Sequence, residues 1–265
     1  MIRILHLSDL HYGRDRAELE TPLVELCNDL APDLVVISGD FTQRARISQF
    51  DRAEAFLERI EPPTLSVPGN HDTPLDNIFV RFFAPWRRYK AAIDRNLEPV
   101  WENDLAVVVG VNTVNRFSWQ RGRISGRTVR RVCRGFANAG ERARILVLHH
   151  PLEHGPEVEK RLMRGAMDAL SDLEACGADV VLSGHLHNTV TTPFEAAPGL
   201  LFVQAGTGLS NRLRGEPNTV NLVEATRDQI AITTWSAEEA AFTAEPEVRF
   251  RRVDREWRRA ESDAA

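Results

Sequence analysis

Short apolar runs alternate with longer amphipathic segments through the first two thirds of the chain. The uninterrupted runs predict buried β-strands at residues 2–8, 34–38, 64–67, 105–112, 145–148 and 180–183. Between them, apolar residues that recur with a period near 3.6 predict helices at about residues 19–30, 48–60, 125–138 and 157–175. This alternation, with its short connections, is typical of a layered α/β sheet, in which ligand sites lie beyond the carboxyl ends of the strands.

The alternation stops after residue 187. Consecutive strands are predicted at residues 200–205, 218–225 and 229–235, so we expect the second half of the sheet to be mixed or antiparallel. The last segment, residues 241–265, is dense in charges of both signs and predicts an exposed arm that ends in a short helix. No Pro/Gly/Ser-rich linker divides the chain, so we expect residues 1–240 to form a single domain.

Residues 76–93 predict a helical insertion in which aromatic residues are mixed with basic ones. Its aromatic residues are Phe79, Phe82, Phe83, Trp86 and Tyr89. Two interpretations are open: the aromatic stripe packs on the core, or residues 78–90 form a cap or a membrane-surface face that meets a lipid-like substrate. The arginines at residues 112–138 are likewise either a solvated helix face or a site for a phosphate and a base.

The overall composition narrows the class of protein. Of the 265 residues, 43% are hydrophobic, which is enough for one core, and no apolar run approaches the roughly 20 residues that span a bilayer. The net charge of −5 and a pI near 5.9 argue against a stable nucleic-acid complex. Met1 leads directly into a strand, so we expect a cytoplasmic protein. The three widely spaced cysteines, Cys27, Cys133 and Cys176, predict reduced thiols.

Potential metal ligands follow five of the predicted strands. They are Asp9, His11, Asp40, Asn70, His149, His185 and His187. Asp9 and His11 are two residues apart. So are His185 and His187, and in extended loops such alternate side chains share one face. Carboxylate, imidazole and amide donors without thiolate suit Mn²⁺, Fe, Zn²⁺ or Co²⁺. The donors therefore predict a site for two metal ions, with Asp40, which stands alone after its strand, as the bridging ligand.

Charge favours a phosphodiester as the substrate of such a site. Two divalent ions bring about +4, the two carboxylates remove two charges and a bridging hydroxide removes one, so about one positive charge remains for the singly negative diester. Two ions about 3.5–4 Å apart would activate the shared water and stabilise the attacking and leaving oxygens. His71, which is not needed as a ligand, is then free to donate a proton to the leaving alkoxide.

Four other polar residues near these motifs have structural interpretations. His6 lies within a strand, which predicts a core or hydrogen-bonded histidine. His150 is the neighbour of a ligand, oriented by Pro151, and contact with the substrate is the alternative. His154 is predicted to lie on the surface. Asp72 is either a turn or helix-cap residue or the partner that orients an imidazole.

Five short motifs occur in a fixed order. They are Asp9-Leu10-His11, Gly39-Asp40, Gly69-Asn70-His71-Asp72, His149-His150-Pro151 and Gly184-His185-Leu186-His187. Over residues 9–187 they resemble the signatures of the calcineurin-like metallophosphoesterase superfamily. The resemblance implies an α/β fold, a four-layer αββα sandwich of two mixed β-sheets flanked by helices, with a binuclear metal centre. It implies that His71 is the catalytic histidine, that the first metal is held by Asp9, His11, Asp40 and His187, and the second by Asp40, Asn70, His149 and His185.

The loop Gly-Asp-Phe-Thr-Gln-Arg at residues 39–44 narrows the resemblance further. Together with the His-His-Pro and Gly-His-Leu-His motifs, it is similar to that of bacterial class III cyclic nucleotide phosphodiesterases and glycerophosphodiesterases. The similarity implies a metal-dependent phosphodiesterase for a small soluble diester, with a cyclic nucleotide as the first candidate. The alternatives are a hydrolase of lipid-linked phosphodiesters or pyrophosphates, a nuclease, and a metal-binding interaction module without catalysis. We expect a monomer or homodimer, with Arg44, His150, Asn112 and Arg116 as candidate substrate-binding residues.

Overall fold

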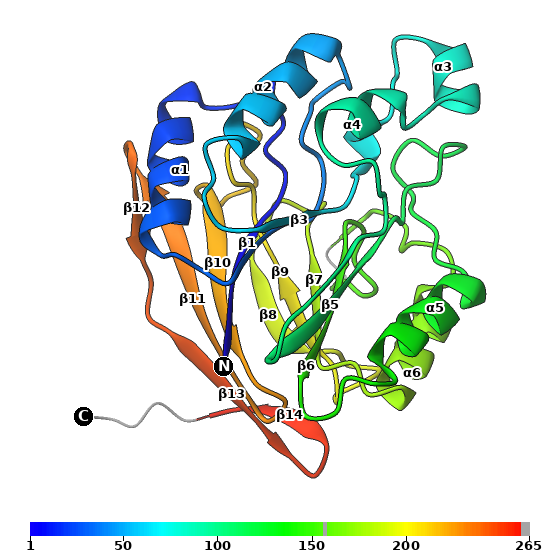
Figure 1. Ribbon diagram of the computed structural model, residues 1–265, viewed down its shortest axis with the longest axis vertical. Coiled ribbons are helices and arrows are strands. Elements are labelled where there is room, and N and C mark those ends of the chain that lie inside the picture. The colour runs from blue at the N-terminus through cyan, green and yellow to red at the C-terminus, as the bar shows by residue number, and fades with distance from the viewer. Residues whose placement is uncertain (156–157, 261–265) are drawn as a thin grey trace.

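Two β-sheets pack face to face in the computed structural model, which describes residues 1–155 and 158–260 (Figure 1). Within these residues the first sheet has eight strands in the order β14-β13-β11-β10-β1-β2-β3, with β12 beside β11. They are β1 (Ile2–Leu7), β2 (Leu34–Ile37), β3 (Thr64–Ser66), β10 (Thr219–Ala225), β11 (Gln229–Glu238), β12 (Ala241–Ala244), β13 (Val248–Val253) and β14 (Glu256–Arg259). The second has six in the order β4-β5-β6-β7-β9-β8. They are β4 (Val100–Glu102), β5 (Ala106–Val111), β6 (Ala143–Leu148), β7 (Val180–Ser183), β8 (Val190–Pro193) and β9 (Leu201–Gln204).

Helices cover the outer face of each sheet. Two of them, α1 (Glu20–Asp29) and α2 (Ile47–Leu57), pack on the first sheet, and α5 (Gly126–Phe136) and α6 (Ala166–Ala175) pack on the second (Figure 1). A third apolar core fills the space between the two sheets. The predicted four-layer αββα sandwich of two mixed sheets is therefore confirmed.

Parallel pairing places the functional loops at one edge of the sandwich. In the first sheet β1 pairs in parallel with β2, and β2 with β3. In the second sheet β5, β6, β7 and β9 are also parallel neighbours. The central strands are apolar on both faces because both faces are covered, which explains why their sequences are uninterrupted runs rather than alternating patterns. The loops that follow these strands emerge side by side.

The expected charged C-terminal arm is wrong, because the chain up to residue 259 continues the first sheet. Strands β12, β13 and β14 extend it by antiparallel pairing, so the sheet does not end at residue 240. Charged residues mask an alternating pattern there, in which Phe250 and Trp257 are buried in the core between the sheets. Arg252 lies over the Trp257 ring at 4.4 Å and pairs with Asp179 at 2.6 Å. The end of the expected arm, residues 261–265, lies outside the described residues.

Two predicted helices are shorter in the structure. The helix expected at 157–175 is helical only as α6, which begins after Gly165 in a left-handed conformation (φ 80°); its expected first residue lies outside the described part of the chain. The insertion at 76–93 forms two short helices, α3 (Ile78–Phe83) and α4 (Arg87–Ala92), with Pro85 between them. Pro85 has no amide hydrogen to donate, which favours a break at this point. Two 3-10 turns, η1 (Ala17–Leu19) and η2 (Asn70–Asp72), complete the helical elements of the described chain.

The cysteine prediction is wrong for two of the three residues. Cys133 and Cys176 form a disulfide that joins α5 to the end of α6, with Cα atoms 5.5 Å apart. The two residues are 43 positions apart in sequence, and only the side-by-side packing of the two helices brings them together. Cys27 is a free, buried thiol. No helix in the described part of the chain has the length and apolar character that a membrane span requires.

Candidate metal centre

Backbone hydrogen bonds join the loops that follow β1 and β2. Asp9 donates its N–H to the Gly39 carbonyl at 3.0 Å, and His11 donates to the Asp40 carbonyl at 3.0 Å. Asp9, His11 and Asp40 all have positive φ angles of 50–55°, and His185 has 76°. Asp and His tolerate this left-handed conformation better than most residues, at a cost of about 1–3 kcal/mol each. The expectation of extended loops is wrong, and compact turns present these side chains instead.

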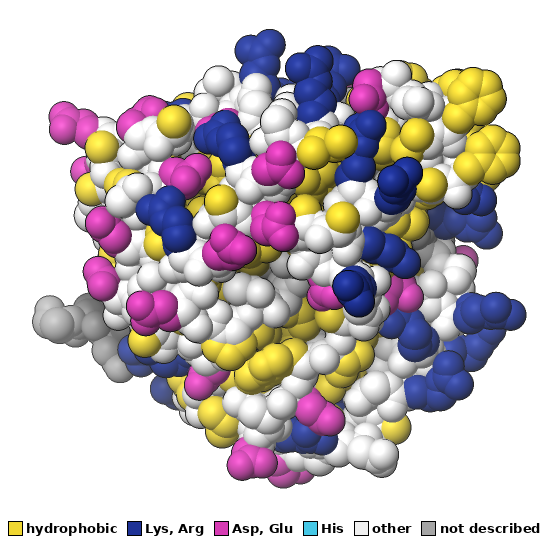
Figure 2. All heavy atoms as spheres, turned by 45° about the horizontal axis from the view of Figure 1, so that its top comes forward, with side chains coloured by type: hydrophobic (Ala, Val, Ile, Leu, Met, Phe, Trp, Pro, Cys, Tyr) yellow, Lys and Arg dark blue, Asp and Glu magenta, His cyan; other side chains and the backbone are white. Residues whose placement is uncertain are grey.

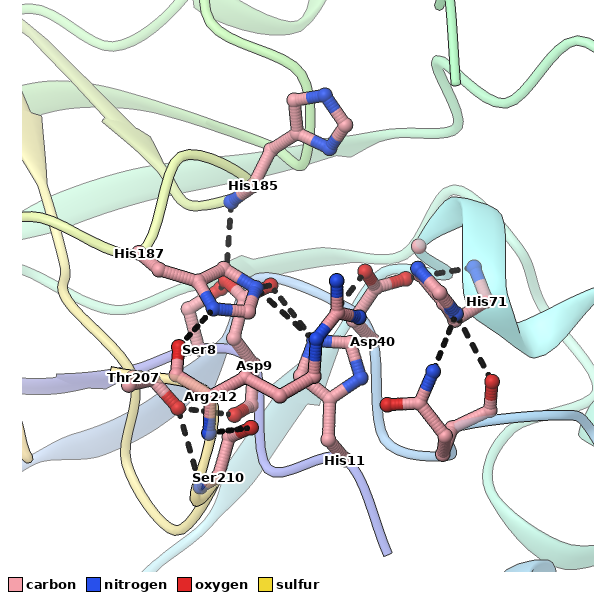
Figure 3. A network of polar contacts seen from close by, with 12 residues as sticks. Ser8, Asp9, His11, Asp40, His71, His185, His187, Thr207, Ser210 and Arg212 are labelled. Atoms are coloured by element: carbon pink, nitrogen blue, oxygen red, sulfur yellow. Dashed lines mark hydrogen bonds and ion pairs between the residues drawn. The ribbon is translucent and has the colours of Figure 1, made fainter. Parts of the chain in front are cut away.

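The first cluster of donors contains Asp9, His11, Asp40 and His187 (Figure 3). Asp9 Oδ1 lies 3.3 Å from His11 Nε2 and 3.1 Å from His187 Nε2. The two Nε2 atoms are 3.0 Å apart. Asp40 Oδ2 lies 3.7 Å from His11 Nε2. Four side chains from three separate loops therefore direct ligand atoms at one small volume.

The second cluster surrounds His149 Nε2. This atom lies 3.3 Å from Asp40 Oδ2, 3.2 Å from Asn70 Oδ1 and 3.3 Å from His185 Nδ1. Asp40 Oδ2 is thus shared by the two clusters, while Asp40 Oδ1 accepts a hydrogen bond from the His71 amide at 2.8 Å. The structure brings together all seven candidate ligands and positions one carboxylate oxygen between two groups of donors.

The hydrogen bonds of the imidazoles show that the clusters fit cations. His149 Nδ1 donates to the Ser38 carbonyl at 2.8 Å, and His187 Nδ1 donates to the Arg212 carbonyl at 3.1 Å. In a neutral ring the opposite nitrogen, Nε2, is then bare and its lone pair faces a carboxylate oxygen. Asp9 Oδ1 is buried and has no hydrogen-bond donor among the described residues. Lone pairs that converge in this way repel one another unless a proton or a metal cation lies between them.

The shifted pKa values of the carboxylates and of His149 also indicate that the clusters favour positive charge. Burial by itself would raise the pKa of Asp9, but His187 and His11 hold that pKa well below its ordinary value. Burial would also raise the pKa of Asp40, and His149 and His71 lower it. Burial would lower the pKa of His149, yet Asp40 raises it to about 9. The two buried carboxylates therefore stay ionised and require nearby cationic charge.

Asp72 holds the turn around the second cluster. Its carboxylate accepts hydrogen bonds from the Thr42 amide at 2.9 Å, the Gly69 amide at 2.9 Å and the Phe41 amide at 3.3 Å. Burial and the charge of Asp40 raise the pKa of Asp72 to about 7. Of the two interpretations of Asp72, the turn residue is therefore correct, and its contacts tie the loop after β2 to the loop after β3.

Gly39 and Gly69 allow these two loops to touch. A Cβ atom on Gly69 would overlap the Asp40 carboxylate and the Asp40 backbone nitrogen. A Cβ atom on Gly39, whose φ is 99°, would lie 2.7 Å from the Gly69 nitrogen and 2.9 Å from His149 Nδ1. Neither position has room for a side chain, so glycine is required for the close approach of the two loops.

His71 lies beside the ligand clusters with one nitrogen free. Its Nδ1 donates to the Gln43 carbonyl at 2.8 Å, and its ring centre is 4.9 Å from that of His11. Because Nδ1 is used to hold the ring, Nε2 is available for proton transfer. Figure 3 shows His71 next to Asp40. Gln43, which orients this histidine, was not among the predicted site residues.

A loop after β9 also supports the site, although none of its residues was among the predicted site residues. Thr207 Oγ1 donates to the Asp9 carbonyl at 2.7 Å, and the carbonyl of Arg212 orients His187 (Figure 3). Ser8 Oγ donates to Asp9 Oδ2 at 2.6 Å. The sequence does contain a pattern that indicates Thr207, because this residue follows the apolar run of β9, and β9 pairs in parallel with β7 and ends at the same edge of the sheet.

The other predicted histidines have different environments. His6 is buried and hydrogen-bonded to Ser38 Oγ at 2.9 Å, as expected. His150 Nδ1 is paired with Thr113 Oγ1 at 2.8 Å, and its ring centre lies 4.6 Å from that of His185. Burial lowers the pKa of His150 to about 3, so this ring is neutral. His154, expected on the surface, is half-buried.

Three of the candidate substrate-binding residues have other surroundings. Arg44 has an exposed side chain, and its backbone amide donates to Gln49 Oε1. Asn112 and Arg116 line a hollow of about 420 Å³ whose lining includes none of the seven candidate ligands. The structure thus brings His150 to the metal centre. Substrate binding by the other three residues stays a prediction.

A family model described as calcineurin-like phosphoesterase matches residues 2–189 of the chain. This segment spans well over half of the chain and contains every candidate ligand. The chain belongs to the calcineurin-like phosphoesterase family. The resemblance inferred from the five motifs is confirmed. Membership of this family implies a metal-dependent phosphoester hydrolase, and the described residues include histidine and aspartate groups able to bind metal ions.

Known calcineurin-like phosphoesterases resemble the chain at low sequence identity. Glycerophosphodiester phosphodiesterase GpdQ of Enterobacter lignolyticus (strain SCF1) is 23% identical over 208 residues, which cover 73% of this chain and 74% of that protein. Purple acid phosphatase PPD1 from yellow lupin (Lupinus luteus) has a similar fold, with a TM-score of 0.68 and 14% identity. The match covers 94% of this chain, which spans about half of the lupin protein (53%). A dimetal phosphatase from Danio rerio gives a TM-score of 0.66 at 11% identity, with 92% and 98% of the two chains covered.

Proposed function

We propose that this protein is a phosphodiesterase in which two metal ions are held by the seven donors described above. Asp9, His11, Asp40 and His187 would hold the first ion, and Asp40, Asn70, His149 and His185 the second. The observation that carries the proposal is the position of Asp40 Oδ2, 3.7 Å from His11 Nε2 and 3.3 Å from His149 Nε2. A carboxylate shared between two groups of neutral donors is suited to bridging two cations.

The charge of the donor set supports a diester rather than a more highly charged monoester. With two divalent ions bound, the two carboxylates would leave a charge of about +2 at the site, and one further anionic ligand would reduce it to about +1, which matches the single negative charge of a phosphodiester. The similarity to GpdQ, a glycerophosphodiester phosphodiesterase, agrees with this choice. Small diesters, with a cyclic nucleotide or a glycerophosphodiester as the first candidates, are the proposed substrates.

The chain's own residues would divide the reaction between them. When bound, the metal ions would polarise the phosphoryl oxygens and acidify a water molecule. His71, held at Nδ1 by the Gln43 carbonyl, would give the proton on Nε2 to the leaving alkoxide. His150 Nε2 is buried and has no hydrogen-bond partner among the described residues, so it is the candidate that the geometry favours for substrate contact.

Leaving-group dependence tests the role of His71. An alkyl diester needs a proton on its leaving oxygen, whereas p-nitrophenolate leaves without one. The hydrolysis rate of His71→Ala should therefore fall about 10²- to 10⁴-fold with the alkyl diester and much less with bis-p-nitrophenyl phosphate. The enzyme is assayed with added Mn²⁺, and His154→Ala serves as a matched histidine control. Equal losses on both substrates would remove the proton-donor role.

The same assay separates an enzyme from a metal-binding module. Asp40→Ala should abolish hydrolysis of both diesters, because it removes the shared ligand. A wild-type protein that retains two metal ions per chain but hydrolyses no diester, whichever of Mn²⁺, Fe, Zn²⁺ and Co²⁺ is supplied, would favour the module and contradict the proposal.

A further inference from the structure

The most exposed aromatic side chains gather on one protrusion. Phe79 and Phe83 are 72% and 83% exposed, and Phe117 and Trp119 are 71% and 68% exposed. Among the described residues, no other aromatic side chain is a large exposed hydrophobic group. We name this surface, formed by residues 78–83 and 116–119, the aromatic ridge. Figure 2 shows hydrophobic side chains projecting beside lysine and arginine side chains at the corner where Figure 1 places α3.

A buried arginine joins the two segments of the ridge. Arg81 is only 6% exposed, and it donates to the carbonyls of Arg116 at 3.0 Å and Ser118 at 2.8 Å. The rings of Phe82 and Phe117 stack with their centres 5.6 Å apart. The exposed rings are therefore held by a hydrogen-bonded base and are not side chains on a loose loop.

The ridge differs in charge from the rest of the molecule. The segments that carry the ridge, residues 76–93 and 112–124, contain seven basic residues and one acidic residue, which gives them a charge of +6. Because the net charge of the whole chain is −5, the rest of the chain carries a charge of −11. Asp76, the one acid, is already paired with Arg88 at 3.2 Å. The hollow of about 420 Å³ beside Phe117 is lined by Arg116 and Arg123 and by no acidic residue. The ridge thus combines exposed rings with cations and a basic hollow.

We propose that the aromatic ridge docks on the surface of an anionic lipid bilayer, with its rings at the level of the headgroups. Exposed aromatic and apolar side chains flanked by arginine and lysine are the chemistry that binds such a surface. A second copy of this chain is disfavoured as the occupant, because a symmetric contact would bring two net-positive surfaces together. The lipid surface supplies both the apolar phase for the rings and the negative charge for the cations.

Docking would place the metal centre close to the headgroups. Arg81 Nη1 donates to Thr73 Oγ1 at 2.8 Å, and Thr73 follows Asp72 directly. On the other side, a Cβ atom on Gly122 would lie 2.5 Å from His150 Cγ, so the loop that carries Phe117 rests against that histidine. This consequence rests on the proposed function, and it would bring lipid headgroup diesters, in addition to the small diesters proposed above, within reach of the same site. The docking itself does not depend on catalysis.

Vesicle binding without turnover tests the proposal. The probes are vesicles of phosphatidylcholine alone and of phosphatidylcholine mixed with phosphatidylglycerol, measured by co-sedimentation. The wild-type protein should bind the mixed vesicles, and the double variant Phe79→Ser/Phe83→Ser should bind them at least about tenfold more weakly. Arg87→Gln/Lys90→Gln should weaken binding and reduce its sensitivity to salt. Met167→Ser/Leu213→Ser removes two exposed hydrophobic side chains elsewhere and should bind like the wild type.

Three results would overturn docking on a bilayer. One is equal binding of wild-type protein and the double Phe variant, and another is failure of the wild type to bind either kind of vesicle. The third is concentration-dependent self-association, without vesicles, that the Phe variant abolishes, because this would assign the ridge to a second copy. All variants keep the seven donors, so hydrolysis of soluble bis-p-nitrophenyl phosphate reports separately on the proposed function.

Discussion

Replacing Asp40 with asparagine separates the metal-binding role of this residue from its structural role. Asp40 is 1% exposed, and its Oδ2 is shared between the two donor clusters. An amide of nearly the same shape keeps the oxygen that accepts from the His71 amide at 2.8 Å. The variant loses the negative charge and one oxygen ligand, and it gains an NH₂ group next to His149 Nε2.

Metal binding should fall much more than the stability of the metal-free protein. Removing one charge of a buried pair costs about 3–5 kcal/mol, so metal ions should bind about 10²- to 10⁴-fold more weakly. The metal-free protein loses the ion pair between Asp40 and His149, but the new NH₂ can donate to a neutral His149 Nε2 and the repulsion that raises the pKa of Asp72 disappears. Its loss of stability should therefore be smaller than that of a buried ion pair broken without a replacement. Hydrolysis of bis-p-nitrophenyl phosphate should fall with metal occupancy.

Metal content per chain, urea unfolding of the metal-free protein and diester hydrolysis are the three measurements. Asp179→Asn is the matched control, because Asp179 is equally buried but lies outside the donor clusters and pairs with Arg252 at 2.6 Å. This control should lose about 3 kcal/mol of stability while keeping its metal ions. An Asp40→Asn protein that retains two tightly bound ions and near wild-type turnover would refute the assignment of Asp40 as the bridging ligand.

Three further predictions concern the frame around the site. Gly69→Ala should lower the free energy of unfolding by about 2–3 kcal/mol and should also lower the metal content, because the Cβ atom meets the Asp40 carboxylate and backbone. Wild-type values in thermal melts and metal analysis would contradict this. Burial raises the pKa of Cys27 to about 12, so its thiol stays protonated in the folded chain while the unfolded chain ionises above about pH 9. Stability should therefore fall by about 1.4 kcal/mol per pH unit between about pH 9 and 12, and Cys27→Ala should flatten that part of the profile in urea titrations; an unchanged slope would count against it. Reducing the Cys133–Cys176 disulfide opens a 43-residue loop, and on the chain-entropy account the free energy of unfolding should fall by up to about 4 kcal/mol. Three reactive thiols in the unfolded protein before any reductant is added would show that the bond is absent.

Local sequence patterns were sufficient for the elements that lie close to the site. The run before Asp40 is apolar throughout because β2 is buried on both faces, and a strand of this kind is recognisable from its own residues. The polar residues after each run could be grouped without coordinates, since parallel strands deliver their carboxyl ends to one edge. The left-handed conformations of Asp9 and His11 could not be seen, because they depend on hydrogen bonds to the loop that follows β2.

Elements whose partners are distant in sequence were predicted less well. The segment from residue 241 was expected to be an exposed arm because its charges hide Phe250 and Trp257, whose burial depends on the space between the two sheets. The disulfide was missed because 43 residues separate its cysteines, and the packing of α5 on α6 creates the contact. In both cases the deciding neighbour belongs to another part of the chain.

The sequence by itself determined the alternation of strands and helices before the site motifs, the donor types at the strand ends and the resemblance to a phosphoesterase family, because these depend on short-range pattern and chemistry. Only the tertiary structure decided that one oxygen of Asp40 lies between two groups of donors and that Asp72 braces the turn. It also divided the aromatic residues of the insertion, because Tyr89 is buried in the core while Phe79 and Phe83 are exposed. The physical reason is that burial and ligand geometry depend on which distant surfaces meet, and a residue's own neighbours in sequence do not specify them.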